Sequence, residues 1–573
     1  MKLKHIRIQN FRSIKKCDLG IDKVIALVGE NNSGKSAILR ALNAFFNYKE
    51  EEQDFILGKH QYSAKAKPKV TLTFSGDKTG FAAFTDHDYL AVEVEFNQGK
   101  RVIKVKQTGK FKSSSDQVVD AIKSRIDYYF IPPIRDHKNL EWASTTVFRR
   151  LAEDYLYKAT EKRDNYTPKF KGATDYLEKN GFAKLGQYIR KMYHVRSNFD
   201  FKLTFPDDPS FIQFIGGLKF MVAEGAAEHE ISECGTGVQS LTIIALHRAL
   251  AAINGKSVIL GLEEPETNLH PQAQREVIRS LKKNIDDADD LVNQVIFTTH
   301  STIMIDSVDH TDVVLFRKID DTTRGFQTLV TQVPSDFYQK YDVEEQRYYQ
   351  FHHYRNSDFF YAKVVVVVES KNDGQVIQEL MRKEGYELDD LGVSILSLDG
   401  VSNLTYAVSL IRELGLPSLV VVDKDFFLPY EKDSQDESRD ANGFPKYRKA
   451  FSTDRLMQIK TLLPNQKDRD QLLPLLWGNH TKAMEFLAKH GVVCMKWAME
   501  IDLANSTKGR ELMGKALKLP PGDPTAKRLL IDFKKKLKKV EVLTPVVRDL
   551  PRKNYPHSLS KICELLGALL EKV

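Results

Sequence analysis

The chain has 573 residues, of which 42% are hydrophobic and 28% are charged, and a net charge of +8. The length predicts about three globular domains, and the mild positive charge is compatible with a polyanionic partner without requiring one. Four widely spaced cysteines exclude a disulfide scaffold and a zinc knuckle. No segment resembles a signal peptide or a membrane helix, so we expect a soluble, cytoplasmic protein.

The first forty residues predict two strands, at residues 4–8 and 17–21, followed by a phosphate-binding loop. An apolar run at 24–28 leads into the sequence GENNSGKS, and a helical pattern follows it. In this strand, loop and helix context, backbone N–H groups surround phosphates, Lys35 reaches the outer phosphates and Ser36 offers its hydroxyl to Mg²⁺. The candidate nucleotide-binding residues are Gly29, Asn31, Asn32, Ser33, Gly34, Lys35 and Ser36.

The segment after this loop predicts an added β-layer and a helical insertion. Residues 69–74, 90–96 and 101–107 alternate apolar and polar side chains, which indicates an antiparallel meander. A buried strand near residues 128–131 ends at Pro132 and Pro133, because proline has no N–H for the ladder. The region of about 140–215 is rich in lysine, arginine and tyrosine at helical spacing. We expect it to serve packing or dimerisation rather than DNA contact.

Three further motifs follow in chain order. A glycine-rich turn at residues 235–239 opens a strong helix and forms a second candidate anion site, with Thr236, Gly237 and Gln239. The strand at 257–262 ends in Glu263 and Glu264. Here Glu263 would hold the water shell of Mg²⁺ together with Ser36, and Glu264 would be the catalytic base that polarises the attacking water. The strand at 294–299 ends in His300, which is placed to sense the γ-phosphate.

Phosphate loop, glycine turn, acidic strand and histidine occur in the order of the ATP-binding cassette (ABC) ATPases, and the opening with NFRSI resembles the RecF and SMC group. The resemblance implies that Thr236 stands where the family has serine. It also implies that ATP lies between two copies, in a homodimer or a higher even-numbered assembly. Glu263 stands where the family has aspartate, one methylene shorter, so the metal geometry departs from the pattern and we expect slow turnover.

Charged and aromatic residues between 334 and 361 mark a boundary, so we predict an ATPase domain at 1–345, a linker at 346–361 and a second domain at 362–573. The second domain begins with a five-valine strand, typical of a buried parallel sheet, that ends in Glu369. A later strand at 419–422 ends in Asp423, in a β-α-β-α-β pattern. Open α/β sheets bind ligands at this strand edge. The carboxylates expected to converge there are Glu369, Asp373, Asp423 and Asp425.

Clustered carboxylates need cations, and hard divalent ions with oxygen ligands are the natural partners. Two ions about 3.5–4 Å apart can clamp the attacking water and the leaving oxygen of a phosphodiester. The alternative is that Asp423 and Asp425 only cap a loop. The pattern predicts an α/β chain in which an ABC/RecF/SMC-like ATPase with a helical insertion precedes a Rossmann-like parallel sheet.

The strand ending in Glu369 with Asp373, and the later DxD at Asp423, resemble a Toprim domain. An ABC-type ATPase followed by Toprim resembles the OLD (overcoming lysogenisation defect) family. This resemblance implies ATP, Mg²⁺ or Mn²⁺, DNA cleavage with Glu369 and Asp423 as catalytic residues, and defence against phage. Relatives act alone, with a helicase, or with a retron reverse transcriptase and its DNA, and nothing in the sequence selects among these partners.

The resemblance also implies a second acidic cluster, matched by the metal-ligand candidates Glu500 and Asp502, and a late catalytic lysine, for which Lys553 is favoured over Lys561. The basic run at 534–539 either tracks phosphates or is a solvated helix face. The main alternative function is an ATP-gated DNA clamp or repair factor without nuclease activity. A topoisomerase is a weaker third reading, because no module that could hold a nucleophilic tyrosine is recognisable.

Overall fold

The computed structural model describes residues 1–51, 61–76, 81, 84–85, 87–97, 100–133, 147–158, 160–183, 221–224, 227–285, 292–322, 325–345, 357–520, 522 and 524–572. It divides into two compact units. The first contains residues 1–25, 34–299 and 320–327, and the second contains residues 26–33, 300–319 and 328–573. Among the described helices, none combines the length and the apolar character needed to cross a bilayer.

An antiparallel sheet forms much of the first unit, and it confirms the predicted meander. Apolar side chains alternate with polar ones along β4 and β5, so one face of this sheet is buried. Its strands, in spatial order, are β2 (Ile14–Gly20), β1 (Lys2–Phe11), β4 (Lys69–Ser75), β5 (Tyr89–Asn97), β6 (Lys100–Gln107) and β7 (Lys110–Ser114).

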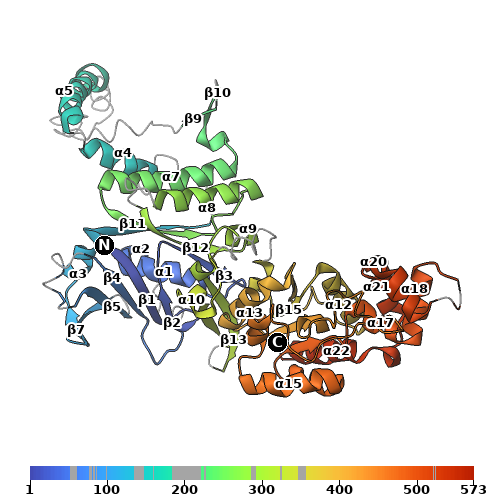
Figure 1. The fold of residues 1–573 in the computed structure, drawn as a ribbon. Helices are drawn as coiled ribbons and strands as arrows, with labels where there is room; N and C mark the ends of the chain where they lie inside the picture. Colours follow the sequence, from blue (N-terminus) through green and yellow to red (C-terminus); the bar gives the residue numbers. More distant parts are fainter. Residues whose placement is uncertain are drawn as a thin grey trace. The chain divides into compact units, whose positions relative to one another are not determined.

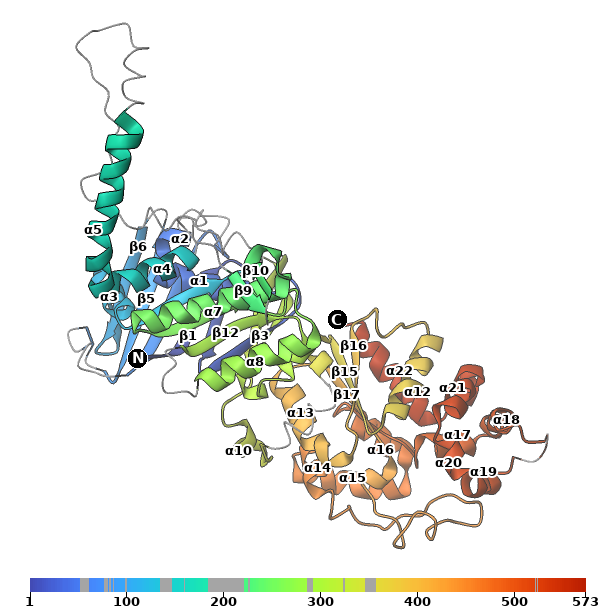
Figure 2. The ribbon, with the colours of Figure 1, turned by 90° about the horizontal axis from the view of Figure 1, so that it is seen from above.

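A second six-stranded sheet carries the nucleotide motifs. Its order is β14 (Gly325–Gln332), β13 (Val313–Asp321), β3 (Val24–Gly29), β12 (Val292–Thr299), β11 (Ser257–Glu263) and β8 (Ile126–Ile131). Strand β11 runs parallel to both β8 and β12. Helices α7 (Thr236–Asn254) and α8 (Pro271–Ile285) lie side by side in both views of the ribbon (Figures 1 and 2).

Gly261 in the middle of β11 permits close packing with helix α1 (Lys35–Phe46). A Cβ at Gly261 would lie 2.1 Å from Tyr128 Oη, so a larger residue would displace this tyrosine. The Tyr128 hydroxyl donates a hydrogen bond of 2.9 Å to the Leu39 carbonyl in α1. The helix that follows the phosphate loop is thereby tied to the sheet.

Part of the predicted insertion is described. It contains α4 (Val147–Lys158), α5 (Thr160–Leu177) and a π-helix (Glu178–Phe182), and the hairpin of β9 (Met221–Glu224) and β10 (Ala227–Glu230) follows the predicted insertion. The remainder of the region at 140–215 lies outside the described residues, as does most of the predicted linker, of which a 3-10 helix at Ser357–Tyr361 is described. The dimerisation role of the insertion stays a prediction.

The C-terminal part of the second unit is built on a four-stranded parallel sheet, which confirms the predicted β-α-β-α-β pattern. Its order is β16 (Val393–Ser397), β15 (Val364–Val368), β17 (Ser418–Val422) and β18 (Val492–Cys494). Every valine of β15 is buried, as a central strand requires. Helix α12 (Lys371–Lys383) follows β15, and helix α13 (Leu404–Glu413) connects β16 to β17.

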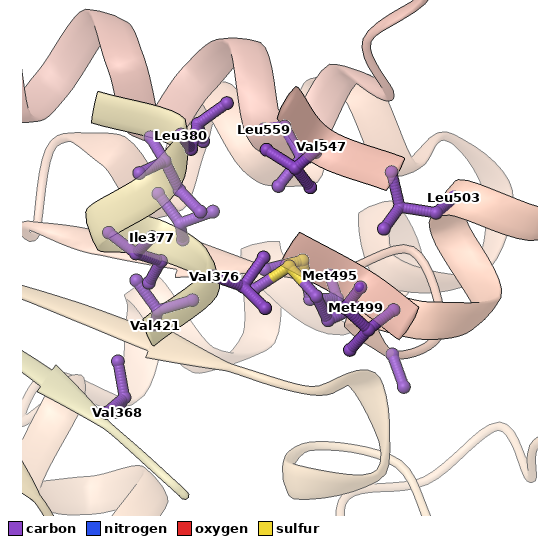
Figure 3. Close-up of a cluster of buried hydrophobic side chains, with 14 of the residues drawn as sticks. Val368, Val376, Ile377, Leu380, Val421, Met495, Met499, Leu503, Val547 and Leu559 are labelled. Carbon is purple, nitrogen blue, oxygen red and sulfur yellow. The ribbon is translucent and has the colours of Figure 1, made fainter. Parts of the chain in front are cut away.

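Helices from the end of the chain complete the core of this sheet. Figure 3 shows Val376, Ile377 and Leu380 of α12 among Met499, Val547 and Leu559 of three later helices. The α-helices described after β17 are α14 (Leu456–Leu462), α15 (Gln466–Gly478), α16 (His480–Ala488), α17 (Met499–Asn505), α18 (Thr507–Ala516), α19 (Ala526–Asp532), α20 (Lys534–Leu537), α21 (Val540–Asp549) and α22 (His557–Leu570). The C-terminal segment therefore belongs to the folded core and holds the strand edge in place.

Candidate functional site

The phosphate loop joins β3 to α1 through two glycines that no other residue can replace without strain. Gly29 has φ 145°, and a Cβ there would lie 2.0 Å from the Phe316 carbonyl oxygen. Gly34 has φ 103° and caps α1, so Lys35 is the first residue of the helix and is only 5% exposed. A glycine-bearing loop that leads directly into a helix N-terminus is the backbone arrangement that phosphate binding requires.

The other loop residues also fit a phosphate group. The Ser33 hydroxyl is buried and has no hydrogen-bond partner among the described residues, while its carbonyl accepts 2.8 Å from Thr328 Oγ1. Asn31 and Asn32 are exposed, and Ser36 is half-buried. A buried donor beside a helix N-terminus is satisfied by an anionic oxygen. These residues therefore fit the phosphates and the Mg²⁺ of a nucleotide.

The acidic pair and the histidine leave adjacent parallel strands. Glu263 at the end of β11 is in register with Thr298 of β12, and His300 follows two residues after Thr298. Glu264 has φ 45°, and its backbone N–H donates to the carbonyl and the hydroxyl of Thr298, at 3.1 Å each. Left-handed backbone at a non-glycine residue is costly and is concentrated at functional sites. This strain supports the prediction that Glu264 has a catalytic role.

The glycine turn before α7 is ordered by its own glutamine. Gln239 is 5% exposed, and its Nε2 donates to the carbonyls of Ile231, at 3.2 Å, and Cys234, at 2.9 Å. A Cβ on Gly237 would lie 3.1 Å from Leu269 Cδ2, so the helix start is closely packed. Thr236 is the first residue of α7, and its side chain is outside the described part of the structure. Nucleotide contacts of this turn stay a prediction.

A second site lies at the carboxyl edge of the parallel sheet. Glu369 follows β15 and Asp423 follows β17, and the structure brings them together with Asp373, Asp425 and Glu500. Burial raises the pKa of Asp423 well above its ordinary value, and the other four carboxylates raise it further. Burial likewise raises the pKa values of Glu369, Asp373 and Glu500. The predicted acidic cluster is therefore electrostatically coupled.

The donors of this cluster are carboxylate oxygens, which fit hard divalent cations such as Mg²⁺ and Mn²⁺. Within the described residues, no three His, Cys, Asp or Glu side chains are gathered closely enough to hold an ion as they stand. Asp373 accepts a hydrogen bond of 2.7 Å from Ser370 Oγ, and Tyr430 Oη donates 3.1 Å to Asp425. Ion binding therefore requires these side chains to turn inward. The bound cation would then offset the mutual repulsion of the carboxylates.

Asp502 does not join this cluster. One of its oxygens accepts from the Lys496 N–H at 2.9 Å and from Ser558 Oγ at 2.7 Å, and the other accepts from the Trp497 N–H at 2.9 Å. These three donors occupy the carboxylate, which ties the end of β18 to α22. We assign Asp502 a structural role and keep Glu500 as the metal-ligand candidate in this part of the chain.

The structure places a different lysine at the cluster than the sequence suggested. Lys538 Nζ lies 3.6 Å from Glu500 Oε1, and Glu500, Asp423 and Asp425 raise the pKa of Lys538. Lys553 lies on an exposed 3-10 helix at Arg552–Asn554. Lys561 pairs with Glu485, at 2.8 Å, and with Glu564. The basic run at 534–539 was the signal in the sequence that could have identified Lys538.

A second cation, Arg455, was also missed. Its Nη1 lies 3.9 Å from Asp425 Oδ1, and it approaches from the start of α14, some thirty residues after the DxD motif. Nothing in the spacing of the sequence connects this arginine with the strand edge. The acidic cluster thus has two cations beside it, Lys538 next to Glu500 and Arg455 next to Asp425.

His480, at the start of α16, gives this unit a predicted acid sensitivity. Burial lowers its pKa to about 3, aided by Lys424 and Lys496. The unfolded chain takes up the proton near pH 6.5, so stability is fully present above that pH and is lost as the pH falls towards 3. We expect the free energy of unfolding to fall by about 2 kcal/mol between pH 7 and pH 5 from this group.

Thermal denaturation of wild type and His480→Gln at both pH values measures this contribution. The variant should lose less stability than the wild type on acidification, whereas the exposed His229→Gln should behave as the wild type does. An identical loss in wild type and His480→Gln would contradict the assignment.

Comparison with known proteins gives one family match in the N-terminal part of the chain and another after residue 359. Residues 1–203 and 149–305 match the family described as "AAA ATPase domain", and residues 360–425 match "Overcoming lysogenization defect protein-like, TOPRIM domain". Solved SMC heads are similar over 58% of this chain. One is bound to the C-winged helix domain of ScpA (17% identity, 98% of that chain, TM-score 0.39), and one is from Thermotoga maritima (18%, 100%, 0.33). The two family matches define an AAA-type ATPase domain followed by a Toprim domain.

Two curated relatives are similar to this chain over about three quarters of its length, and a third is similar over a shorter part. The OLD nuclease of Thermus scotoductus is 23% identical over 76% of this chain and 84% of its own length. The Old nuclease of Escherichia phage P2 is 24% identical over 74% and 78%, and the Endonuclease GajA of Bacillus cereus is 25% identical over 30% and 27%. The chain therefore carries an AAA ATPase domain followed by an OLD-like TOPRIM domain, and about three quarters of it is similar to OLD nucleases.

Proposed function

We propose that the chain is a DNA endonuclease that hydrolyses phosphodiesters with Mg²⁺ or Mn²⁺ at the edge of its Toprim sheet, under control of its ATPase. The observation that carries this proposal is the set of five carboxylates at one strand edge, where the other four raise the pKa of Asp423, with Lys538 beside them. Bound divalent ions would supply Lewis acidity and an activated water. The residues that would hold them are Glu369, Asp373, Asp423, Asp425 and Glu500.

The chain's own residues then have distinct tasks at this edge. The parallel pairing of β15 and β17 brings Glu369 and Asp423 to the same edge of the sheet. Lys538 carries a full positive charge that can offset negative charge on the phosphate as the water attacks. Burial by the C-terminal helices lowers the local dielectric response, so each of these interactions is stronger than at an exposed surface.

Removal and return of metal tests this function. Protein treated with EDTA should leave supercoiled plasmid intact, and addition of Mg²⁺ or Mn²⁺ should restore nicking or linearisation. Undiminished cutting in EDTA would contradict a metal-dependent site. Failure to cut with either ion, together with DNA binding that requires ATP, would favour the clamp alternative.

Replacement of the two candidate lysines separates their roles. We expect Lys538→Ala to lower the cleavage rate by on the order of 10²-fold, because one cation next to the reacting phosphate is lost. The exposed Lys553→Ala should cleave at the wild-type rate. Rates of plasmid nicking at saturating Mn²⁺ measure both variants, and the reverse pattern would restore the assignment suggested by the sequence.

Contacts within the second unit support control by ATP. The segment after His300 contains the buried His310, whose ring stacks on Tyr406 of α13 at a centroid distance of 5.5 Å and is hydrogen-bonded to its hydroxyl. Arg317 of β13 donates to the Leu414 carbonyl at the end of α13, at 3.4 Å. Since α13 leads into β17, and Asp423 follows β17, these contacts connect the segment after His300 with the carboxylate edge.

We further infer that two copies of the chain bind ATP between them. The glycine turn at the start of α7 is closely packed and hydrogen-bonded, and a helix start of this kind can bind the nucleotide phosphates of a second copy. The rate of ATP turnover per chain should then rise with protein concentration. A rate independent of concentration in a monomeric sample would contradict this arrangement.

Defence against phage is the role that we propose for this activity. It is supported by the match to the OLD-like TOPRIM family and by the similarity to GajA. Plaque counts on bacteria expressing wild type or Asp423→Asn test it, because only the wild type should reduce plaques. Equal counts in the two strains would contradict a role for cleavage.

A further inference from the structure

Arg455 is a cation directed at the nuclease site from outside the β-α-β core. It caps the start of α14, its side chain is 28% exposed, and Nη1 lies 3.9 Å from Asp425 Oδ1. This separation is longer than a hydrogen bond. The Nη1 atom itself is buried, and it has no hydrogen-bond partner among the described residues. A charged donor is therefore held beside the cluster without an acceptor.

The charge that faces Arg455 would change if the carboxylates bound divalent ions. Two ions at Glu369 and Asp425 would neutralise the charge that faces Arg455, and they would repel the guanidinium unless an anion lay between. A buried donor without an acceptor also costs free energy. Both requirements are met by a phosphate oxygen, since the planar fork of arginine matches phosphate geometry.

Lys538 is a second cation at the same cluster. It approaches Glu500, whereas Arg455 approaches Asp425, and both cations lower the pKa of Glu369 against the effect of burial. A phosphodiester bound at this edge would therefore lie within reach of two cations.

We propose that Arg455 binds a non-bridging oxygen of the phosphodiester at the nuclease site and positions it over the carboxylate edge. The inference rests on the proposed nuclease function and adds the residue that orients the substrate. The competing role is charge compensation alone, in which Arg455 only stabilises Asp425 until metal arrives. The two roles differ once metal is saturating, because a compensating charge is then no longer needed.

The test uses the full chain and a DNA duplex, with Arg455→Gln, Arg455→Lys and a matched control, Arg448→Gln. Arg448 is exposed, and it donates to the Glu431 carbonyl at 3.1 Å. Affinity is measured over a salt series in Ca²⁺, which occupies oxygen sites, and cleavage is measured in saturating Mn²⁺. Melting temperatures verify that each variant is folded.

We expect Arg455→Gln to reduce the salt slope of DNA binding by about 0.9, the value of one phosphate contact. Its kcat/KM for cleavage should fall on the order of 10²-fold, and Arg455→Lys should recover part of this loss. Arg448→Gln should match the wild type in both measurements. An Arg455→Gln variant with an unchanged salt slope and cleavage within about twofold of wild type at saturating Mn²⁺ would overturn the proposal.

The two readouts keep this inference separate from the nuclease function. If the wild type fails to cut DNA, the proposed function is wrong. The salt slope still decides whether Arg455 contacts a phosphate, since a reduced slope supports the contact and an unchanged slope overturns it.

Discussion

Asp423→Asn is expected to abolish DNA cleavage, with a loss on the order of 10³-fold or more. Asp423 lies at the centre of the coupled cluster, because each of the other four carboxylates raises its pKa. Asparagine has nearly the same shape but carries no charge, so the site loses a metal-binding oxygen anion while the packing after β17 is kept. The rate of plasmid nicking in Mn²⁺ measures the effect.

The control for this variant is Asp433→Asn. Asp433 is exposed in the acidic segment that follows the DxD motif, so its removal changes the net charge equally without touching the sheet edge. We expect wild-type cleavage from Asp433→Asn and wild-type ATP hydrolysis from both variants. Cleavage by Asp423→Asn at the wild-type rate would show that the activity resides elsewhere.

Lys35→Ala is expected to reduce ATP hydrolysis by about 10²- to 10³-fold. Lys35 is nearly buried at the first position of α1, where the backbone N–H groups and its ammonium would act on the same phosphates. The variant keeps the glycine geometry of the loop, so the loss should come from the missing charge and not from misfolding. Phosphate release at saturating ATP measures it.

The exposed Lys16→Ala provides the matched control and should hydrolyse ATP normally. Hydrolysis by Lys35→Ala within a few-fold of wild type would contradict the assignment of the loop. The same variant reports on coupling, since its cleavage rate with and without ATP shows whether nucleotide permits or restrains the nuclease.

The parts of the fold that could be predicted from the sequence are those with a strong local signal. The five valines of β15 fit only a buried central strand, and the glycines of the phosphate loop adopt positive φ as the motif requires. Two acidic residues at strand ends were enough to predict the strand edge, because parallel strands end together. The fold class is confirmed by the sheets and by the two family matches.

The cations of the site could not be predicted, because they reach it through tertiary packing. Lys538 and Arg455 come from short segments next to α20 and α14, and neither has a fixed spacing from the carboxylates. The hydrogen bonding of Asp502 could not be predicted either, because its partner Ser558 is 56 residues away. The acidic segment at 431–442 is likewise joined to a distant part of the chain, since Asp436 pairs with Lys534 at 2.8 Å.

The central claim is that divalent ions held by the carboxylate edge perform the cleavage. It is tested most directly by titrating Mn²⁺ into nucleotide-free wild type and Asp423→Asn, with calorimetry for binding and plasmid nicking for activity on the same samples. The account predicts that wild-type nicking rises over the Mn²⁺ range in which ions bind, and that Asp423→Asn binds Mn²⁺ at least about tenfold more weakly and does not nick. Equal Mn²⁺ binding and equal nicking by the two proteins would contradict it.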